Sequence, residues 1–119
     1  ATAQHDLPFS DAVRAGNLLF LSGQIGNLPG TTTLAPGGIA AEAKQAMENI
    51  RAVLAANGAT MDDVVKCTAF LADIKDWPAF NAVYRSYFKA HLPARSAMAA
   101  SGLALGARVE VECIAATGR

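Results

Sequence analysis

The 119-residue sequence predicts one domain of the α+β class, in which a mixed β-sheet carries two helices on one face. The main observation is the order of the periodic segments, which runs strand, strand, helix, strand, helix, strand, strand. Right-handed crossover connections then place both helices on the same side of the sheet. The strands are apolar on both faces, so the side without helices also needs a cover.

The chain is expected to begin with a β-hairpin. Residues 9–15 form its first strand, residues 15–17 (AGN) form the turn, and residues 18–23 form a strongly apolar second strand. Residues 26–38 are rich in glycine, proline and threonine and show no periodicity, which predicts a loop.

Two helices are expected, over residues 39–57 and from residue 76 to residue 88. Apolar residues recur at steps of three and four in the first, and the Asn-Gly pair at 57–58 marks its end. Asp76 is a candidate N-cap of the second helix, and Pro78 suits its first turn. A largely aromatic stripe predicts that this helix packs through its rings. The stripe consists of Phe80, Val83, Tyr84, Tyr87 and Phe88.

Three further strands are expected, at residues 64–72, 95–101 and 108–116. Pro93 supports the start of the second of these, because the residue before a proline is pushed towards extended geometry. The connection between the last two strands is short, so we expect them to lie near each other.

The second strand of the hairpin shows why a partner subunit is expected. Leu18 and Phe20 point to one face of the sheet, and Leu19 and Leu21 point to the other. The helices cover only one of these faces. An exposed apolar face of several strands is larger than a monomer normally tolerates, so we infer that the chain oligomerises.

Composition excludes several kinds of partner. Ten Lys and Arg residues balance ten Asp and Glu residues, so the chain lacks the clustered positive charge that nucleic-acid binding needs. No apolar run approaches the roughly 18 residues of a membrane span, which predicts a soluble protein without a membrane partner. The absence of a leader favours a cytoplasmic location, and the start at Ala1 leaves a processed leader open.

The cysteines and histidines predict neither a disulfide framework nor a metal site. Cys67 and Cys113 each lie in an apolar run, and two cysteines are too few for a disulfide-stabilised scaffold, so we expect reduced, buried thiols. His5 and His91 are far apart and lack the spacing of a third ligand.

The last strand carries two carboxylates on one face, Glu110 and Glu112. Glu110 is expected near the strand start and close to solvent. Glu112 lies between apolar residues towards the middle, where a carboxylate is either paired or functional. Arg95 is its candidate partner. One interpretation is a structural ion pair, and the other is a site in which Arg95 binds a substrate carboxylate beside a water-positioning Glu112.

Five segments of the chain resemble signatures of the Rid family, also called YjgF or RidA-like proteins. Their order and separation are more specific than any one of them, and the PARS segment is the sharpest. The segments are 21–25 (LSGQI), 47–50 (MENI), 81–84 (NAVY), 93–96 (PARS) and 109–115 (VEVECIA).

The resemblance implies a single Rid-like domain over residues 1–119, with a chorismate-mutase-like architecture derived from the ferredoxin-like fold. It also implies a homotrimer whose sheets face the centre, with three sites at subunit interfaces. Family members of this kind hydrolyse reactive enamines and imines, such as 2-aminoacrylate and related 2-imino acids, to 2-keto acids and ammonia. They need no cofactor.

The resemblance also implies roles for individual residues. Arg95 matches the carboxylate-binding arginine, and Glu112 is taken as the glutamate that orients the attacking water. Ser22 and Gly23 match the strand that lines the pocket, and Asn81 matches a helix position near it.

Two positions depart from the pattern of many deaminating members. Phe9 stands where they carry tyrosine, and Ala97 stands where they carry cysteine two positions after the arginine. Both changes make the pocket more apolar, so we expect effects on substrate range or rate.

Two alternative functions stay open at this point. The first is a non-catalytic trimeric module that binds small carboxylates or other proteins. The second is an endoribonuclease or translation inhibitor, which the balanced charge disfavours.

Overall fold

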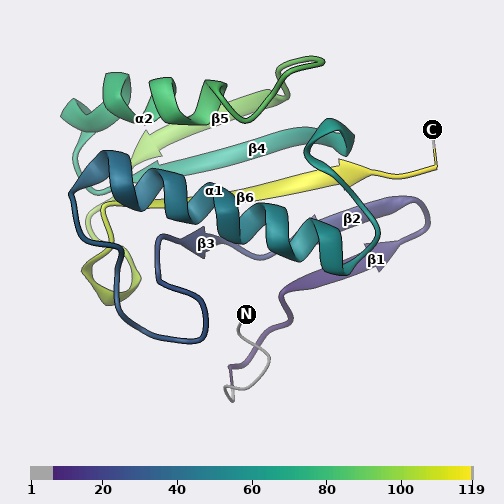
Figure 1. Cartoon of the computed structure of the whole chain (residues 1–119), viewed down its shortest axis with the longest axis horizontal. Helices are drawn as coiled ribbons and strands as arrows, with labels where there is room; N and C mark the ends of the chain where they lie inside the picture. The colour runs from purple at the N-terminus through teal and green to yellow at the C-terminus, as the bar shows by residue number, and fades with distance from the viewer. Residues whose placement is uncertain (1–6, 119) are drawn as a thin grey trace.

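The computed structural model describes residues 7–118 and shows one mixed sheet with two helices packed against the same face (Figure 1). The predicted α+β class is therefore confirmed. The expectation for His5 lies outside the described residues. The strands are β1 Ala12–Ala15, β2 Leu18–Leu21, β3 Gln24–Ile25, β4 Val64–Leu71, β5 Ala94–Ala99 and β6 Val109–Ala116, and the helices are α1 Ile39–Ala56 and α2 Trp77–Arg85.

The strand order is β1-β2-β6-β4-β5, and β3 pairs with β6 beyond the end of β2. Only β4 and β5 run parallel, because the helical crossover through α2 joins them. Our expectation that β5 and β6 lie near each other is wrong, since β4 runs between them. A short connection can lead to the far side of a neighbouring strand as readily as to an adjacent position.

The element boundaries follow the sequence closely where periodicity is strong. Helix α1 ends at Ala56, one residue before the predicted end, and Pro78 lies in the first turn of α2. Asp76 occupies the N-cap of α2 but accepts no side-chain hydrogen bond there. Helix α2 ends at Arg85, and hydrogen-bonded turns carry the chain on to the buried Phe88.

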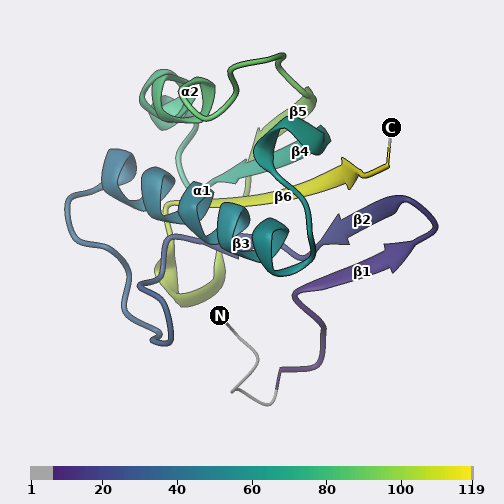
Figure 2. The ribbon, with the colours of Figure 1, turned by 45° about the vertical axis from the view of Figure 1, so that its right-hand side comes forward.

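The core lies between the sheet and the two helices (Figure 2). Strand β6 alternates as predicted, with Val109, Val111 and Cys113 buried on the helix side. Met47 and Ile50 of α1 pack against this layer and are completely buried. The amphipathic pattern of the first predicted helix therefore reports its real packing face.

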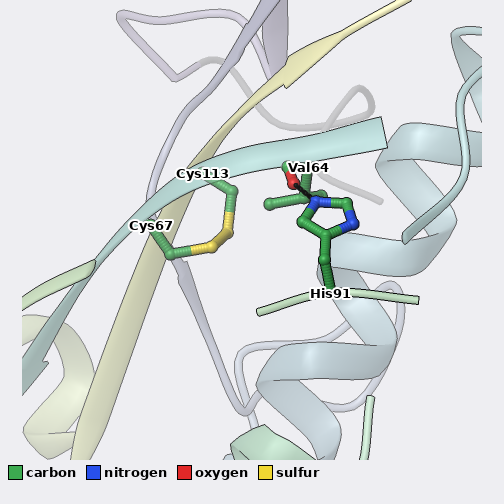
Figure 3. Close-up of a disulfide and its surroundings, with 4 residues drawn as sticks. All are labelled: Val64, Cys67, His91 and Cys113. Atoms are coloured by element: carbon green, nitrogen blue, oxygen red, sulfur yellow. Dashed lines mark hydrogen bonds between the residues drawn. A yellow bond between two sulfur atoms is a disulfide. The ribbon is translucent and has the colours of Figure 1, made fainter. Parts of the chain in front are cut away.

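Cys67 and Cys113 form a disulfide bond between β4 and β6 (Figure 3), so the expectation of two reduced thiols is wrong. The two residues are direct partners in the antiparallel register, and their Cα atoms are 4.1 Å apart. A count of cysteines could not reveal this pairing, because it depends on which strands are neighbours. Next to the disulfide, His91 donates from Nε2 to the carbonyl of Val64 over 3.1 Å, which ties the loop before β5 to β4.

Reduction of the disulfide is expected to lower the free energy of unfolding by about 4 kcal/mol, because the bond closes a long loop in the unfolded chain. The two cysteines are 46 residues apart in sequence. Urea unfolding with and without reductant measures the effect, and the double variant Cys67→Ala/Cys113→Ala should not respond to reductant. Two free thiols in protein unfolded without reductant would contradict the bond.

The face of the sheet opposite the helices is apolar and open within the described chain. Val13, Phe20 and Met98 expose 58%, 40% and 49% of their surface, and all three are large hydrophobic residues. Phe20 pairs with Ile114 across the β2–β6 ladder on this face. No helix within residues 7–118 is long and apolar enough to span a membrane.

Candidate active site

Arg95 lies at the start of β5, the strand at one edge of the sheet, and points towards α2. Its register partner is the buried Cys67, so its side chain lies on the helix-covered face. The guanidinium carbon is 4.8 Å from the ring centre of Tyr84 and 5.5 Å from those of Trp77 and Phe80. Within residues 7–118 no carboxylate pairs with Arg95. A half-buried guanidinium on an aromatic platform is therefore available to an anion.

Two polar side chains of α2, the helix that supplies this platform, carry buried atoms without partners within residues 7–118. Oδ1 of Asn81 and the hydroxyl oxygen of Tyr84 are buried and have no hydrogen-bond partner among the described residues. Burial raises the pKa of Tyr84 to about 12, and the positive charge of Arg95 partly opposes this rise. Ala97 follows Arg95 on the same face of β5. We call Asn81, Tyr84, Arg95 and Ala97 the arginine cluster.

Glu110 and Glu112 lie on the open face of β6, as the period of two predicts, but their burial is the reverse of our expectation. Glu110 is half-buried and Glu112 is exposed. The reason is β3, a strand of only two residues, which pairs Ile25 with Glu110 and covers the start of β6. Burial raises the pKa of the Glu110 carboxyl group, and the negative charge of Glu112 raises it further.

The Glu110 carboxylate occupies space that is free because residue 23 is a glycine. A β-carbon on Gly23 would collide with Oε2 of Glu110, so the carboxylate lies directly against the backbone between β2 and β3. The neighbouring Ser22 donates from its hydroxyl to the carbonyl of Ser10 over 2.6 Å. This bond holds the segment that contains Phe9, whose side chain is 53% exposed. Ser22, Gly23, Glu110 and Glu112 form what we call the carboxylate cluster.

The arginine cluster and the carboxylate cluster do not meet within one chain. Arg95 lies on the helix-covered face at the β5 edge, whereas Glu112 lies on the open face of β6, with β4 between the two strands. The expected contact between Arg95 and Glu112 is therefore absent inside the described part of the chain. Figure 1 shows β5 and β3 on opposite sides of the central strands.

Glu112 instead borders a small hollow on the open face, with a volume of about 100 Å³. Phe20, Thr68 and Ile114 line this hollow, and so does Lys66, whose Nζ donates to the hydroxyl of Ser96 over 3.3 Å. Among residues 7–118, no three His, Cys, Asp or Glu side chains gather as metal ligands would.

Comparison with known proteins gives this arrangement a context. Residues 3–117 match the model of a protein family described as Endoribonuclease L-PSP. The chain belongs to this family. It is the YjgF/RidA family, so the resemblance seen in the five sequence segments is confirmed.

Members of the L-PSP family carry several names. A mouse protein named 2-iminobutanoate/2-iminopropanoate deaminase is 43% identical over 93% of this chain and 82% of its own length. The yeast protein YEO7 has a crystal structure that is 46% identical, with a TM-score of 0.89, covering 94% of this chain and 89% of that one. The crystal structure of E. coli TdcF with bound serine is 31% identical, with a TM-score of 0.88, covering 94% and 90% of the two chains.

Sequence reasoning did not include two residues that the structure places in the candidate clusters of this L-PSP family member. Glu110 was assigned to solvent, because β3 is too short to leave a pattern. Tyr84 was assigned to the core, because its position in an aromatic stripe is typical of helix packing. A buried hydroxyl without a partner becomes visible only in three dimensions.

Proposed function

We propose that this chain is a hydrolase that converts 2-imino acids and their enamine tautomers, including 2-aminoacrylate, to 2-keto acids and ammonia. The unpaired guanidinium of Arg95 carries the proposal, because such substrates are small anions whose carboxylate needs a bidentate partner. The deaminase names of relatives at 43–46% identity support it. The serine bound to TdcF is a molecule of similar size that also carries a carboxylate.

The site is proposed to form between subunits of a homotrimer whose sheets face the centre. The arginine cluster lies at the β5 edge, whereas the carboxylate cluster lies on the open face around β6, so head-to-tail association would bring one cluster of each chain against the other cluster of its neighbour. Such an association closes into a ring. The exposed Phe20 and Met98 on the open face would be covered in the same step.

The proposed reaction adds water across the carbon–nitrogen double bond, after protonation of an enamine at its terminal carbon. Arg95 holds the substrate carboxylate and orients the electrophilic imine carbon. A carboxylate of the carboxylate cluster takes a proton from water as the oxygen bonds to that carbon, and returns it to nitrogen. The carbinolamine then breaks its carbon–nitrogen bond while its hydroxyl proton passes through the same carboxylate to the leaving nitrogen, which releases ammonia and the 2-keto acid. The chemistry needs no cofactor.

Two carboxylates are candidates for this proton transfer. The family resemblance assigns the water to Glu112. The half-burial and raised pKa of Glu110 favour Glu110 instead, because a carboxylate with a higher pKa is a stronger base. We therefore propose that Glu110 transfers the proton and that Glu112 contributes through its negative charge, which raises the pKa of Glu110.

A coupled assay tests the proposed function. A pyridoxal-phosphate-dependent dehydratase would generate 2-aminoacrylate and 2-imino acids with longer side chains, and the rate of keto-acid release would be compared with the spontaneous rate. A non-catalytic carboxylate-binding module would bind 2-keto acids without any acceleration. The same panel measures the preferred side-chain size of the substrate. We propose that Phe9 and Ala97 influence this preference, because they make the pocket more apolar.

Substitution of Gly23 by alanine is expected to lower kcat/KM by about 10-fold or more, because the new methyl group displaces the Glu110 carboxylate. The melting temperature should change little, since only the flexible end of Glu110 has to move. Gly102→Ala is the matched control, because a β-carbon there meets nothing within 4 Å. Wild-type activity of Gly23→Ala would show that the position of Glu110 is not important.

An endoribonuclease is the second candidate function, because the family description names one. The zero net charge disfavours it, since RNA binding depends on clustered Lys and Arg residues. Absent or salt-independent RNA binding would remove this candidate.

A further inference from the structure

The two unpartnered polar atoms of α2 point to a missing partner at the arginine cluster. Buried polar groups in folded proteins nearly always have a hydrogen-bond partner, yet Oδ1 of Asn81 and the hydroxyl of Tyr84 have none within residues 7–118. Both residues lie on the α2 helix, and Arg95 stands over the Tyr84 ring. The unpartnered hydroxyl of Tyr84, next to a guanidinium that no carboxylate pairs within residues 7–118, indicates that a ligand completes this site.

The chemistry of these groups defines that ligand. A guanidinium has only hydrogen-bond donors. It cannot accept the hydroxyl proton of Tyr84. That proton needs an acceptor, and the guanidinium needs a negative charge. One carboxylate meets both needs, because its two oxygens have about four lone-pair positions.

We propose that Tyr84 is a substrate-binding residue whose hydroxyl donates a hydrogen bond to the carboxylate that Arg95 holds, and that it thereby selects 2-imino acids against uncharged imines. This inference rests on the proposed deaminase function and adds a specificity residue to it. Tyr84 is only 5% exposed in the free chain, with the guanidinium over its ring. A carboxylate held by this guanidinium is therefore close to the hydroxyl at the end of the same ring.

The protonation state of Tyr84 fits this role. Its pKa of about 12 keeps the hydroxyl protonated at any pH at which an imine hydrolase works. Tyr84 is thus a permanent donor and not a base. Removal of the hydroxyl should therefore affect ligand binding without changing the pH dependence of the rate.

Calorimetric binding of 2-oxobutanoate, a product of the proposed reaction, tests the inference on the full chain. Tyr84→Phe should raise the Kd about 10-fold, because a hydrogen bond to a charged group is lost. The affinity for the neutral primary amide of the same acid should change much less. Without ligand, the melting temperature of Tyr84→Phe should stay the same or rise, because the variant no longer buries an unpaired hydroxyl.

Tyr87→Phe is the matched control. The Tyr87 hydroxyl donates to Oε2 of Glu48 over 2.7 Å and lies outside the arginine cluster. Its loss should lower the melting temperature and leave the Kd of 2-oxobutanoate unchanged.

The outcomes separate this inference from the proposed function. An unchanged Kd in Tyr84→Phe, or an equal loss for acid and amide, would overturn the inference while the deaminase activity could stand. A lower melting temperature of ligand-free Tyr84→Phe would also overturn it, since the hydroxyl would then have a partner within the protein. A 10-fold weaker Kd in a protein that does not accelerate imine hydrolysis would support the role of Tyr84 and refute the deaminase.

Discussion

Replacement of Arg95 by lysine is expected to lower kcat/KM for 2-iminobutanoate by about 100-fold, although the positive charge is kept. A lysine ammonium cannot form two parallel hydrogen bonds to a carboxylate, and it does not stack on Trp77, Phe80 and Tyr84 as a planar guanidinium does. The substrate would bind more weakly and in a less defined orientation. Steady-state kinetics in the coupled assay measure the loss.

Arg51→Lys is the matched control for this experiment. Arg51 also lies over an aromatic ring, 5.1 Å from the centre of Tyr87, and it pairs with Glu48 on the exposed surface of α1. Its replacement removes the same kind of stacking outside both clusters, so the activity should not change. If Arg51→Lys and Arg95→Lys lost equal activity, the effect would come from general destabilisation and not from a substrate contact.

Mixed oligomers test whether the site is shared between subunits. If Arg95 of one chain acts with Glu110 of the next, inactive Arg95→Ala and Glu110→Gln chains refolded together at equal amounts should regain about a quarter of the wild-type sites. No recovery in mixed oligomers would place both groups in one subunit, which contradicts the proposed arrangement.

Local patterns predicted the elements of this fold well, and long-range pairing limited the rest. Helix α1 and strand β6 were recognisable because their periodicity reports which side faces the core. The order of strands depends on contacts between residues far apart in sequence, which no local pattern contains. The Cys67–Cys113 disulfide and the position of β4 between β5 and β6 both belong to this second kind of information.

The candidate site, too, could be predicted from the sequence only in part. Arg95 could be singled out from the PARS segment and from its position at the start of a predicted strand. The structure adds that no carboxylate pairs with it within residues 7–118. The relative burial of Glu110 and Glu112 could not be predicted. Strand β3 is too short to show alternation, and its pairing helps to cover Glu110. The contact that we expected between Arg95 and Glu112 failed because the two side chains lie on opposite faces of the sheet.

Comparison of the variants Glu110→Gln and Glu112→Gln gives the second large expected effect. Glu110→Gln should lower kcat by about 100- to 1,000-fold, because the proton-transfer group is lost while the size of the side chain is kept. Glu112→Gln should lower kcat much less, since Glu112 is exposed and acts on the reaction through its charge. A larger loss of kcat in Glu112→Gln than in Glu110→Gln would indicate that Glu112 orients the attacking water, as the family resemblance alone suggests.

The pH dependence separates the roles of the two carboxylates further. A base must be ionised, so the wild-type rate should rise with pH through the pKa of Glu110, which lies above its ordinary value of 4.5. Glu112→Gln removes a repelling charge, so this limb of the profile should move to lower pH. A limb that stays in place in Glu112→Gln would mean that another group controls the rate.

Stability should change in the opposite direction from activity at position 110. Folding raises the pKa of Glu110, so the folded chain holds its proton more tightly than the unfolded chain does. The resulting stability is present below the ordinary pKa of 4.5 and is lost as the pH rises through the folded value. Glu110→Gln carries no charge and avoids this loss, so its melting temperature at pH 7 should exceed that of the wild type. A carboxylate that lowers stability is typical of a functional site. A lower melting temperature of Glu110→Gln would instead make Glu110 a structural residue.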